Sequence, residues 1–222
     1  MNKYIGFLIL IWFTNSFSQS IPNGFVYIHE TIPSIKLEIR YYSVNNFTGK
    51  KVDGYLKPLT IISKEASLPL IEIQKELNKQ NLGLKIFDAY RPQKAVNYFV
   101  KWARDWNDTI AKSFYYPNIK KRFLFKEGYI ASKSGHSRGS TLDLTIVNLK
   151  TGKEIDMGSP YDLFDPISST YSTKITVKQQ HNRLLLKNIM NAHGFRNYPK
   201  EWWHFTLRNE PYPTTYFDFD LK

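Results

Sequence analysis

The segment Thr141–Val147 constrains the fold of this chain more than any other part of it. Every second residue from Leu142 onward is apolar, and the residues between them are polar or β-branched. This period of two is typical of a β-strand that buries one face against other elements. Asp143 would lie on the opposite face, where a carboxylate either meets solvent or needs a partner or a metal ion.

Residues 64–80 are expected to form the first long helix, because their apolar residues recur at helical spacing. Ser63 precedes this segment and is a suitable N-cap. Pro69 fits poorly inside a helix, so Ser67 is an alternative N-cap that would place Pro69 in the first turn.

Two more helices and two more strands are expected along the chain. The helices are expected over 92–107 and 177–192, and the strands over 84–89 and 202–207. Residues 152–173 contain two glycines and two prolines and indicate loops, whereas the aromatic and basic residues 108–132 favour no single structure. Helices beside a mixed or antiparallel sheet make the expected fold class α+β, in a single domain.

The N-terminal residues predict an export signal. Lys3 is followed by a nearly unbroken apolar run over 4–13 and then by small residues that end at Ser18. The run is too short to cross a bilayer as a helix, so we expect cleavage after Ser18, with an uncleaved anchor as the alternative. This predicts a signal peptide at 1–18, one domain at 19–222, a periplasmic or secreted location, and no stable membrane insertion after cleavage.

The chain has no cysteine, which excludes disulfides, thiolate catalysis and a lipid anchor on an N-terminal cysteine. Any metal site must therefore use histidine and carboxylate ligands. The net charge is +12, but the lysines are spread along the chain and form no basic stripe. We therefore expect no nucleic-acid partner, and attribute the charge to solubility or to attraction by an anionic cell envelope.

Two histidines and two acids form the candidate catalytic group. His136 and Asp143 lie in SGHSRGSTLD, and Glu201 and His204 lie in EWWHF. Two imidazoles and one carboxylate suit a tetrahedral Zn²⁺ with its fourth position open to water. A second carboxylate near such an ion can take a proton from that water.

The spacing of Glu201 and His204 sets a condition on this group. Residues three apart in an ideal strand point to opposite faces. A shared site therefore requires Glu201 to lie in a loop after Pro199, with the strand beginning beyond it. The alternative is that the two tryptophans between them are core residues and that His204 is an ordinary interior histidine.

Arg91 follows a predicted strand in the string FDAYRP, at a strand-to-helix corner. A guanidinium at such a corner can hold a carboxylate or a developing oxyanion through two hydrogen bonds. A structural ion pair with Asp88 is the alternative.

Three of these motifs, taken in their order and spacing, resemble a known family. DAYRP, SGHSRGSTLD and EWWHF resemble the zinc D-alanyl-D-alanine dipeptidases, the VanX-like group of D,D-peptidases. IRYYSVNNFTG and MGSPYDLFD resemble two further segments of that family, so the resemblance covers nearly all of the chain after the signal peptide. It implies a Hedgehog/D,D-peptidase-like fold.

The resemblance also implies a role for each matching residue. It implies one Zn²⁺ per chain, held by His136, Asp143 and His204. Glu201 would act as the general base and Arg91 would stabilise the transition state, while Ser134 and Asp162 would contact the substrate, Asp162 through its ammonium group. Thr141 departs from the family pattern, which commonly has a smaller residue there, and this puts the close packing around the site in question.

The resemblance predicts a zinc metallopeptidase that hydrolyses the dipeptide D-Ala-D-Ala to two D-alanines in cell-wall turnover. A peptidoglycan D,D- or L,D-carboxypeptidase with a more open cleft is one alternative. A non-catalytic, zinc-containing module that binds the cell wall is another, although the presence of Glu201 favours an enzyme. No feature of the sequence indicates an oligomeric state.

Overall fold

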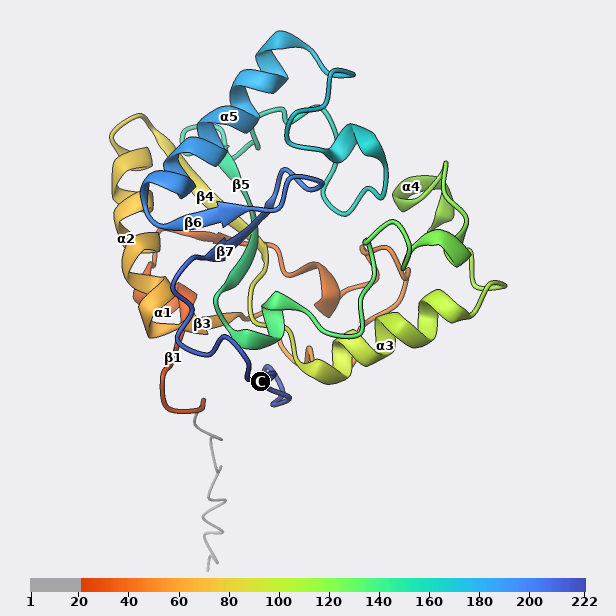
Figure 1. Ribbon diagram of the computed structural model, residues 1–222. Helices are drawn as coiled ribbons and strands as arrows, with labels where there is room; N and C mark the ends of the chain where they lie inside the picture. The colour runs from red at the N-terminus through yellow and green to blue at the C-terminus, as the bar shows by residue number, and fades with distance from the viewer. Residues whose placement is uncertain (1–20) are drawn as a thin grey trace, which may run out of the picture.

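The computed structural model describes residues 21–222, which are arranged around one mixed sheet (Figure 1). The strands are β1 (Phe25–Tyr27), β2 (Lys36–Leu37), β3 (Ile61–Ser63), β4 (Leu82–Asp88), β5 (Thr141–Asn148), β6 (Phe195–Asn197) and β7 (His204–Leu207). The α-helices are α1 (Ile28–Thr31), α2 (Lys64–Asn78), α3 (Gln93–Arg104), α4 (Lys112–Tyr115) and α5 (Val177–Ala192). The 3₁₀ helices are η1 (Arg40–Tyr42), η2 (Lys121–Phe123), η3 (Gly135–Arg138) and η4 (Pro166–Ser168).

The main sheet has the strand order β2-β4-β5-β7-β6. β2 runs parallel to β4, and the other neighbouring pairs are antiparallel. β1 and β3 form a separate antiparallel pair. The expected α+β class, with a mixed sheet and flanking helices, is confirmed.

The two faces of the main sheet have different surroundings. The apolar residues of the alternating pattern in β5 lie in a large core with residues of α2 and α5, which flank the sheet in Figure 1. The polar residues of the pattern point the other way, but they are buried too, and Asp143 is only 2% exposed. The option of a solvent-facing Asp143 is therefore wrong, because the layer that contains α3 covers this face.

The hydroxyl of Ser63 accepts a hydrogen bond from the backbone N–H of Ala66 (3.3 Å), so α2 begins after Ser63. This confirms Ser63 rather than Ser67 as the N-cap. Pro69 lies inside the helix, where one backbone hydrogen bond is missing. The apolar face of α2, which includes the fully buried Leu70, packs on the sheet and outweighs that loss.

α5 matches the predicted 177–192 and opens with a capping box. α3 ends at Arg104, three residues earlier than predicted. The ammonium of Lys121 donates hydrogen bonds to the carbonyl oxygens of Trp102 and Asp105, each at 2.9 Å. These carbonyls are thereby satisfied without a further helical turn, so the helix stops.

The last strand of the sheet is shorter than predicted, because β7 begins at His204, and its partner β6 is absent from the prediction. The residues before β7 form a turn, in which the side-chain amide of Asn197 donates to the carbonyls of Glu201 and His204, each at 3.0 Å. Trp202 and Trp203 are buried in the large core. Glu201 therefore lies in a turn, as a shared site with His204 requires.

The structure bears differently on the predicted signal peptide and on the connection 108–132. The predicted signal peptide at 1–18 lies outside the described residues. Residues 108–132, for which the sequence favours no single structure, contain α4 and η2 joined by turns. A helix with the length and apolar character needed to cross a membrane is absent from residues 21–222.

A buried arginine of α5 fixes the loop between β5 and α5. Arg183 is fully buried, and its guanidinium donates hydrogen bonds to the carbonyl oxygens of Met157, Ile167 and Ser169 at 2.6–2.8 Å. It also donates to the hydroxyl of Ser159 at 3.0 Å. One side chain therefore ties α5 to two separate stretches of this loop.

Replacing Arg183 with methionine is expected to lower the free energy of unfolding by about 3 kcal/mol, because the carbonyls that Arg183 satisfies are left buried without partners. Urea denaturation followed by circular dichroism measures this change. Lys178→Met, at an exposed position of the same helix, is the control and should change stability little. Equal effects of the two substitutions would contradict an anchoring role for Arg183.

Candidate metal centre and active site

Three polar side chains form a row across the central strands of the sheet. Asp88 of β4 pairs with Asp143 of β5, and Asp143 pairs with His204 of β7. Side chains of directly paired residues project from the same side of a sheet and lie close together. Strand pairing therefore brings Asp143 and His204 together, although they are far apart in the sequence.

A register shift in β4 places Asp88 in this row. Ile86 pairs with Leu144, but Asp88 pairs with Asp143, so two residues of β4 advance against one residue of β5. Without this bulge Asp88 would lie on the core-facing side with Ile86. The bulge sets two carboxylates side by side, an arrangement that is unfavourable unless cations lie beside them.

η3 brings His136 to the same end of the sheet. The hydroxyl of Ser134 caps this short helix by accepting a hydrogen bond from the backbone N–H of His136 (3.3 Å). Nδ1 of His136 donates to the carbonyl oxygen of Ala89 (2.7 Å). This bond fixes the ring and leaves Nε2 with a free lone pair, as in many metal-bound histidines.

The atoms Nε2 of His136, Oδ1 of Asp143 and Nδ1 of His204 form a nearly equilateral triangle. The two nitrogens are 3.3 Å apart, and Oδ1 lies 3.3 Å from His136 and 3.1 Å from His204. Oδ1 is buried and makes no hydrogen bond. A tetrahedral ion with ligand distances of about 2.0 Å separates its ligand atoms by about 3.3 Å. The triangle therefore fits one face of a zinc site.

The surrounding charges favour the ionised form of Asp143. Burial alone would raise the pKa of Asp143, but the imidazoles of His136 and His204 outweigh burial and hold this pKa below its usual range. The other carboxylate oxygen, Oδ2, lies 3.5 Å from Nη2 of Arg91 and accepts a hydrogen bond from the hydroxyl of Tyr161 (3.1 Å). Oδ1 is thus left as an anionic ligand atom.

Arg91 makes the predicted structural ion pair and also reaches the centre. Its Nε donates to Asp88 at 2.9 Å, and its Nη2 lies 3.5 Å from Asp143. The guanidinium also lies over the rings of Tyr41 and Phe99, at 5.0 and 5.2 Å from their centroids. Arg91 therefore makes the structural ion pair and also contributes to the site. Asp88 fixes one edge of the guanidinium, and the rest of the group faces the cavity.

Glu201 reaches the ligand triangle from the turn before β7. Its Oε2 lies 3.6 Å from Nδ1 of His204, and 13% of its side chain is exposed. Burial, more than any neighbouring charge, raises the pKa of Glu201 to about 7. A carboxyl group with this pKa can both take and return a proton near neutral pH, as a general base must.

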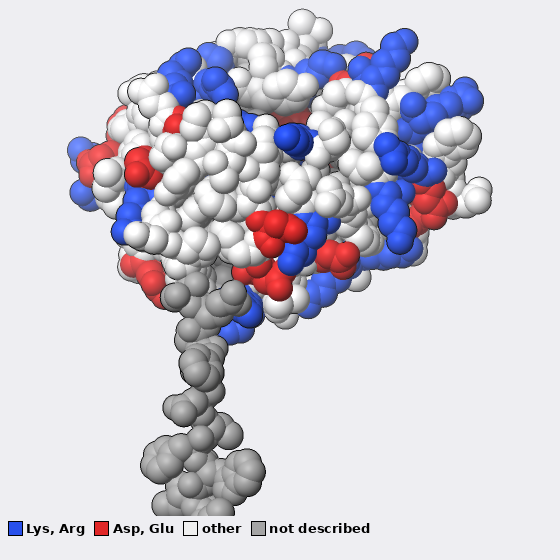
Figure 2. All heavy atoms as spheres, turned by 60° about the horizontal axis from the view of Figure 1, so that its bottom comes forward, with Lys and Arg blue, Asp and Glu red and all other residues white. Residues whose placement is uncertain are grey.

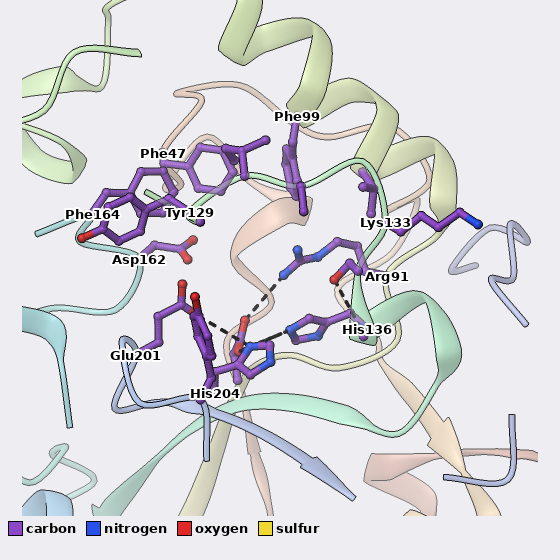
Figure 3. Close-up of a pocket in the computed structure, with 18 of the residues that line it drawn as sticks. Phe47, Arg91, Phe99, Tyr129, Lys133, His136, Asp162, Phe164, Glu201 and His204 are labelled. Atoms are coloured by element: carbon purple, nitrogen blue, oxygen red, sulfur yellow. Dashed lines mark hydrogen bonds and ion pairs between the residues drawn. The ribbon is translucent and has the colours of Figure 1, made fainter. Parts of the chain in front are cut away.

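Asp162 lies on the far side of the same cavity. Figure 3 shows Asp162 and Glu201 directing their carboxyl groups into the space that His136 and His204 face. Asp162 has a left-handed backbone (φ 61°), and its Oδ2 accepts a hydrogen bond from the hydroxyl of Tyr41 (2.8 Å). Burial, and then the charge of Asp143, raises the pKa of Asp162 well above its usual range, and a cation bound beside Asp162 would lower this pKa again and restore the carboxylate.

Thr141 is accommodated close to the ligands. Its hydroxyl lies 2.9 Å from that of Thr206 on β7, so the two form a buried hydrogen bond. A Cβ atom at Gly135 would lie only 2.7 Å from the Thr141 hydroxyl oxygen. Gly135, which directly precedes His136, has no side chain and therefore leaves room for Thr141.

The site residues line a cavity of about 320 Å³, which is at the small end for ligand pockets (Figure 3). Ser134 and Arg91 lie on its lining, with the three ligand residues and both acids. An aromatic wall closes the other side, as Figure 3 shows in part; it consists of Tyr41, Phe47, Phe99, Tyr129 and Phe164. A cavity of this size suits a small ligand with charged ends.

Sequence reasoning missed three residues of this centre: Asp88 as a member of the row, Tyr41 and Tyr161. The Tyr161 hydroxyl lies 3.2 Å from that of Tyr41, so a hydrogen-bonded chain runs from Asp143 through the two tyrosines to Asp162. Both tyrosines lie in segments that carry the family resemblance, which was a usable signal. The signal for Asp88 was an acid at the end of an apolar strand.

Comparison with known proteins gives consistent matches. The model of the peptidase M15 family, described as D-ala-D-ala dipeptidase, matches residues 22–222. A D-alanyl-D-alanine dipeptidase of Enterococcus faecium is 41% identical over 199 residues, which cover 90% of this chain and 98% of that protein.

Two further relatives carry the same name. The D-alanyl-D-alanine dipeptidase of Streptomyces coelicolor is 42% identical over 201 residues, which cover 90% of this chain and all of that protein. The one of Escherichia coli is 31% identical over 175 residues, which cover 79% of this chain and 80% of that protein. The similarity therefore extends across most of the length of each protein.

Proposed function

The chain belongs to the peptidase M15 family of D-Ala-D-Ala dipeptidases, and on that premise we propose that it hydrolyses D-Ala-D-Ala to two molecules of D-alanine. The observation that carries this proposal is the triangle of ligand atoms with the Glu201 carboxylate 3.6 Å from one of its corners. A metallopeptidase requires this combination of an open metal site and an adjacent proton acceptor.

His136, Asp143 and His204 would hold the Zn²⁺ ion, and their donor set and spacing fit it. The ion bound there would supply Lewis acidity toward the substrate carbonyl and toward water. Glu201 then takes the proton of the attacking water and delivers it to the nitrogen of the departing D-alanine. Arg91, held by Asp88, stabilises the negative charge that develops on the carbonyl oxygen.

Asp162 would select the free end of the dipeptide. Its carboxyl group is buried, lines the cavity and accepts a hydrogen bond from Tyr41, so it can pair with the ammonium group of the substrate. Ser134 lines the same cavity and would contact the substrate as well. A longer peptide would have to bury an uncharged amide beside Asp162, which leaves that carboxylate without a counter-charge.

The decisive experiment compares hydrolysis of D-Ala-D-Ala and of a stem pentapeptide that ends in D-Ala-D-Ala. We expect the purified protein to cleave the dipeptide, to lose activity with a chelator, and to regain it when Zn²⁺ is restored. Preference for the pentapeptide would instead identify a carboxypeptidase. Binding of wall fragments without turnover of either substrate would identify a binding module.

Replacing Asp162 with asparagine is expected to raise KM for D-Ala-D-Ala about tenfold or more, because a charge-assisted hydrogen bond to the ammonium is lost. The effect should be much smaller for a dipeptide whose amino group is acetylated, since it carries no charge to pair with Asp162. Steady-state kinetics on both substrates measures the difference. An unchanged KM for the free dipeptide would exclude Asp162 as the ammonium partner.

We also propose that the protein acts outside the cytoplasm, in cell-wall turnover. The support for this location is the apolar run over residues 4–13 and the small residues that end at Ser18. N-terminal sequencing of the protein from the periplasm or the medium tests it. A mature N-terminus near residue 19 is expected, and a cytoplasmic protein that begins at Met1 would contradict it.

A further inference from the structure

The connection that runs from the end of α3 through α4 to η2 exposes an unusual number of large apolar side chains. In residues 21–222, eleven large apolar residues are strongly exposed, and five of them come from this short stretch. They are Trp106, Ile110, Phe114, Phe123 and Phe125, with exposed fractions from 38% to 77%. Single exposed apolar residues are normal, but a group of them marks a surface that contacts something else.

Basic side chains surround these apolar ones. Residues 104–126 contain six lysines and arginines but only two aspartates, and one of these, Asp108, is paired with Lys50 at 2.8 Å. Figure 2 shows Lys and Arg side chains gathered on the side of the molecule where Figure 1 places α3 and α4. The basic aromatic surface is defined here as the five apolar residues together with the exposed basic residues Arg104, Lys120, Arg122 and Lys126.

Buried residues pack beneath the basic aromatic surface. The ammonium of Lys121 is buried 3.9 Å from the ring centroid of Trp102 and bonds two backbone carbonyls. Tyr116 and Leu124 are buried beside it. These buried residues form a packed base under part of the surface, and hollows of the molecular surface lie beside Trp106 and beside Ile110 and Phe114.

We propose that the basic aromatic surface docks on an anionic lipid membrane. Lysine and arginine are attracted to lipid phosphates, while tryptophan and phenylalanine enter the boundary between headgroups and acyl chains. An anionic wall polymer would match the charge but offers nothing to the rings of Trp106 and Phe114, which are 66% and 77% exposed. None of the residues of this surface lines the catalytic cavity, so docking leaves the hydrolytic machinery untouched.

Co-sedimentation with lipid vesicles tests the proposal. We expect the protein to bind vesicles that contain phosphatidylglycerol and not vesicles of phosphatidylcholine alone. The double variants Trp106→Ala/Phe114→Ala and Arg122→Gln/Lys126→Gln should each lower the partition coefficient at least tenfold, with hydrolysis of soluble substrate unchanged. All proteins are compared both as full chains and as chains that begin at residue 21. Any membrane binding that depends on the apolar residues before position 21 is then recognised as a difference between the two forms.

Matched controls keep the result specific to this surface. Leu68→Ala/Val177→Ala removes exposed apolar side chains from α2 and α5, and Lys150→Gln/Lys153→Gln removes exposed charges after β5. Both should bind vesicles within twofold of the parent. Equal losses in the controls would show unspecific attraction and overturn the proposal.

A second measurement separates a membrane from a charged polymer. Trp106 is the exposed tryptophan of residues 21–222, so in chains that begin at residue 21 brominated lipids should quench its fluorescence on binding, and Trp106→Phe should remove that quenching. If soluble poly(glycerol phosphate) binds the protein as tightly as vesicles do, and the aromatic variant binds both like the parent, the surface recognises a phosphate polymer and the proposal fails.

Discussion

Replacement of Glu201 with glutamine is expected to lower kcat for D-Ala-D-Ala about 10³-fold, within the usual contribution of a general base. Glutamine keeps the size of the side chain but cannot take a proton from water. Glu201 is not a corner of the ligand triangle, which His136, Asp143 and His204 form. The variant should therefore retain one zinc ion per chain and the parent fold.

The measurement combines steady-state kinetics with zinc content and thermal unfolding of the same preparations. Glu201→Asp retains a proton acceptor but withdraws it by one methylene, so its kcat should fall between those of the parent and Glu201→Gln. Glu127→Gln, an exposed acid on the loop after η2, is the matched control and should leave kcat unchanged. A Glu201→Gln variant that keeps more than a tenth of the parent kcat would show that another group accepts the proton.

The elements that the sequence predicted best are those with a clear signal inside the segment itself. β5 has an apolar residue at every second position, and α5 has apolar residues at helical spacing from Leu184 to Met190, and the bounds of both agree with the prediction to within one residue. β6 has only three residues and depends on β7 for its hydrogen bonds, so no local pattern reveals it. The end of α3 depends on Lys121, a residue well beyond it in the sequence.

In the site, too, some features follow from the local sequence and others depend on distant segments. The motifs around His136 and His204 indicated metal chemistry, because residue types alone limit which ions can bind. The contribution of Asp88 depends on a one-residue bulge in β4, and the position of Asp162 depends on a left-handed backbone in a long loop. Neither feature follows from residue spacing, because each is set by the packing of distant segments.

Replacement of His136 with alanine is expected to abolish zinc binding and turnover together, because it removes one of three ligand atoms and the Ala89 hydrogen bond that orients the ring. The same substitution also tests how much metal binding adds to the free energy of unfolding. An ion present at a hundred times its dissociation constant adds about 2.7 kcal/mol to the native state. For a domain of this size that corresponds to a rise in melting temperature of about 5–10 °C.

The parent should therefore lose about this much melting temperature when a chelator is added and recover it with Zn²⁺, whereas His136→Ala should melt at one temperature under all three conditions. His181→Ala, at an exposed position on α5, is the control and should respond to the chelator like the parent. A His136→Ala protein that still binds one equivalent of zinc and is still destabilised by the chelator would place the metal elsewhere. In that case the triangle of His136, Asp143 and His204 would be a hydrogen-bonded cluster without an ion, and the hydrolytic function proposed for it would lose its basis.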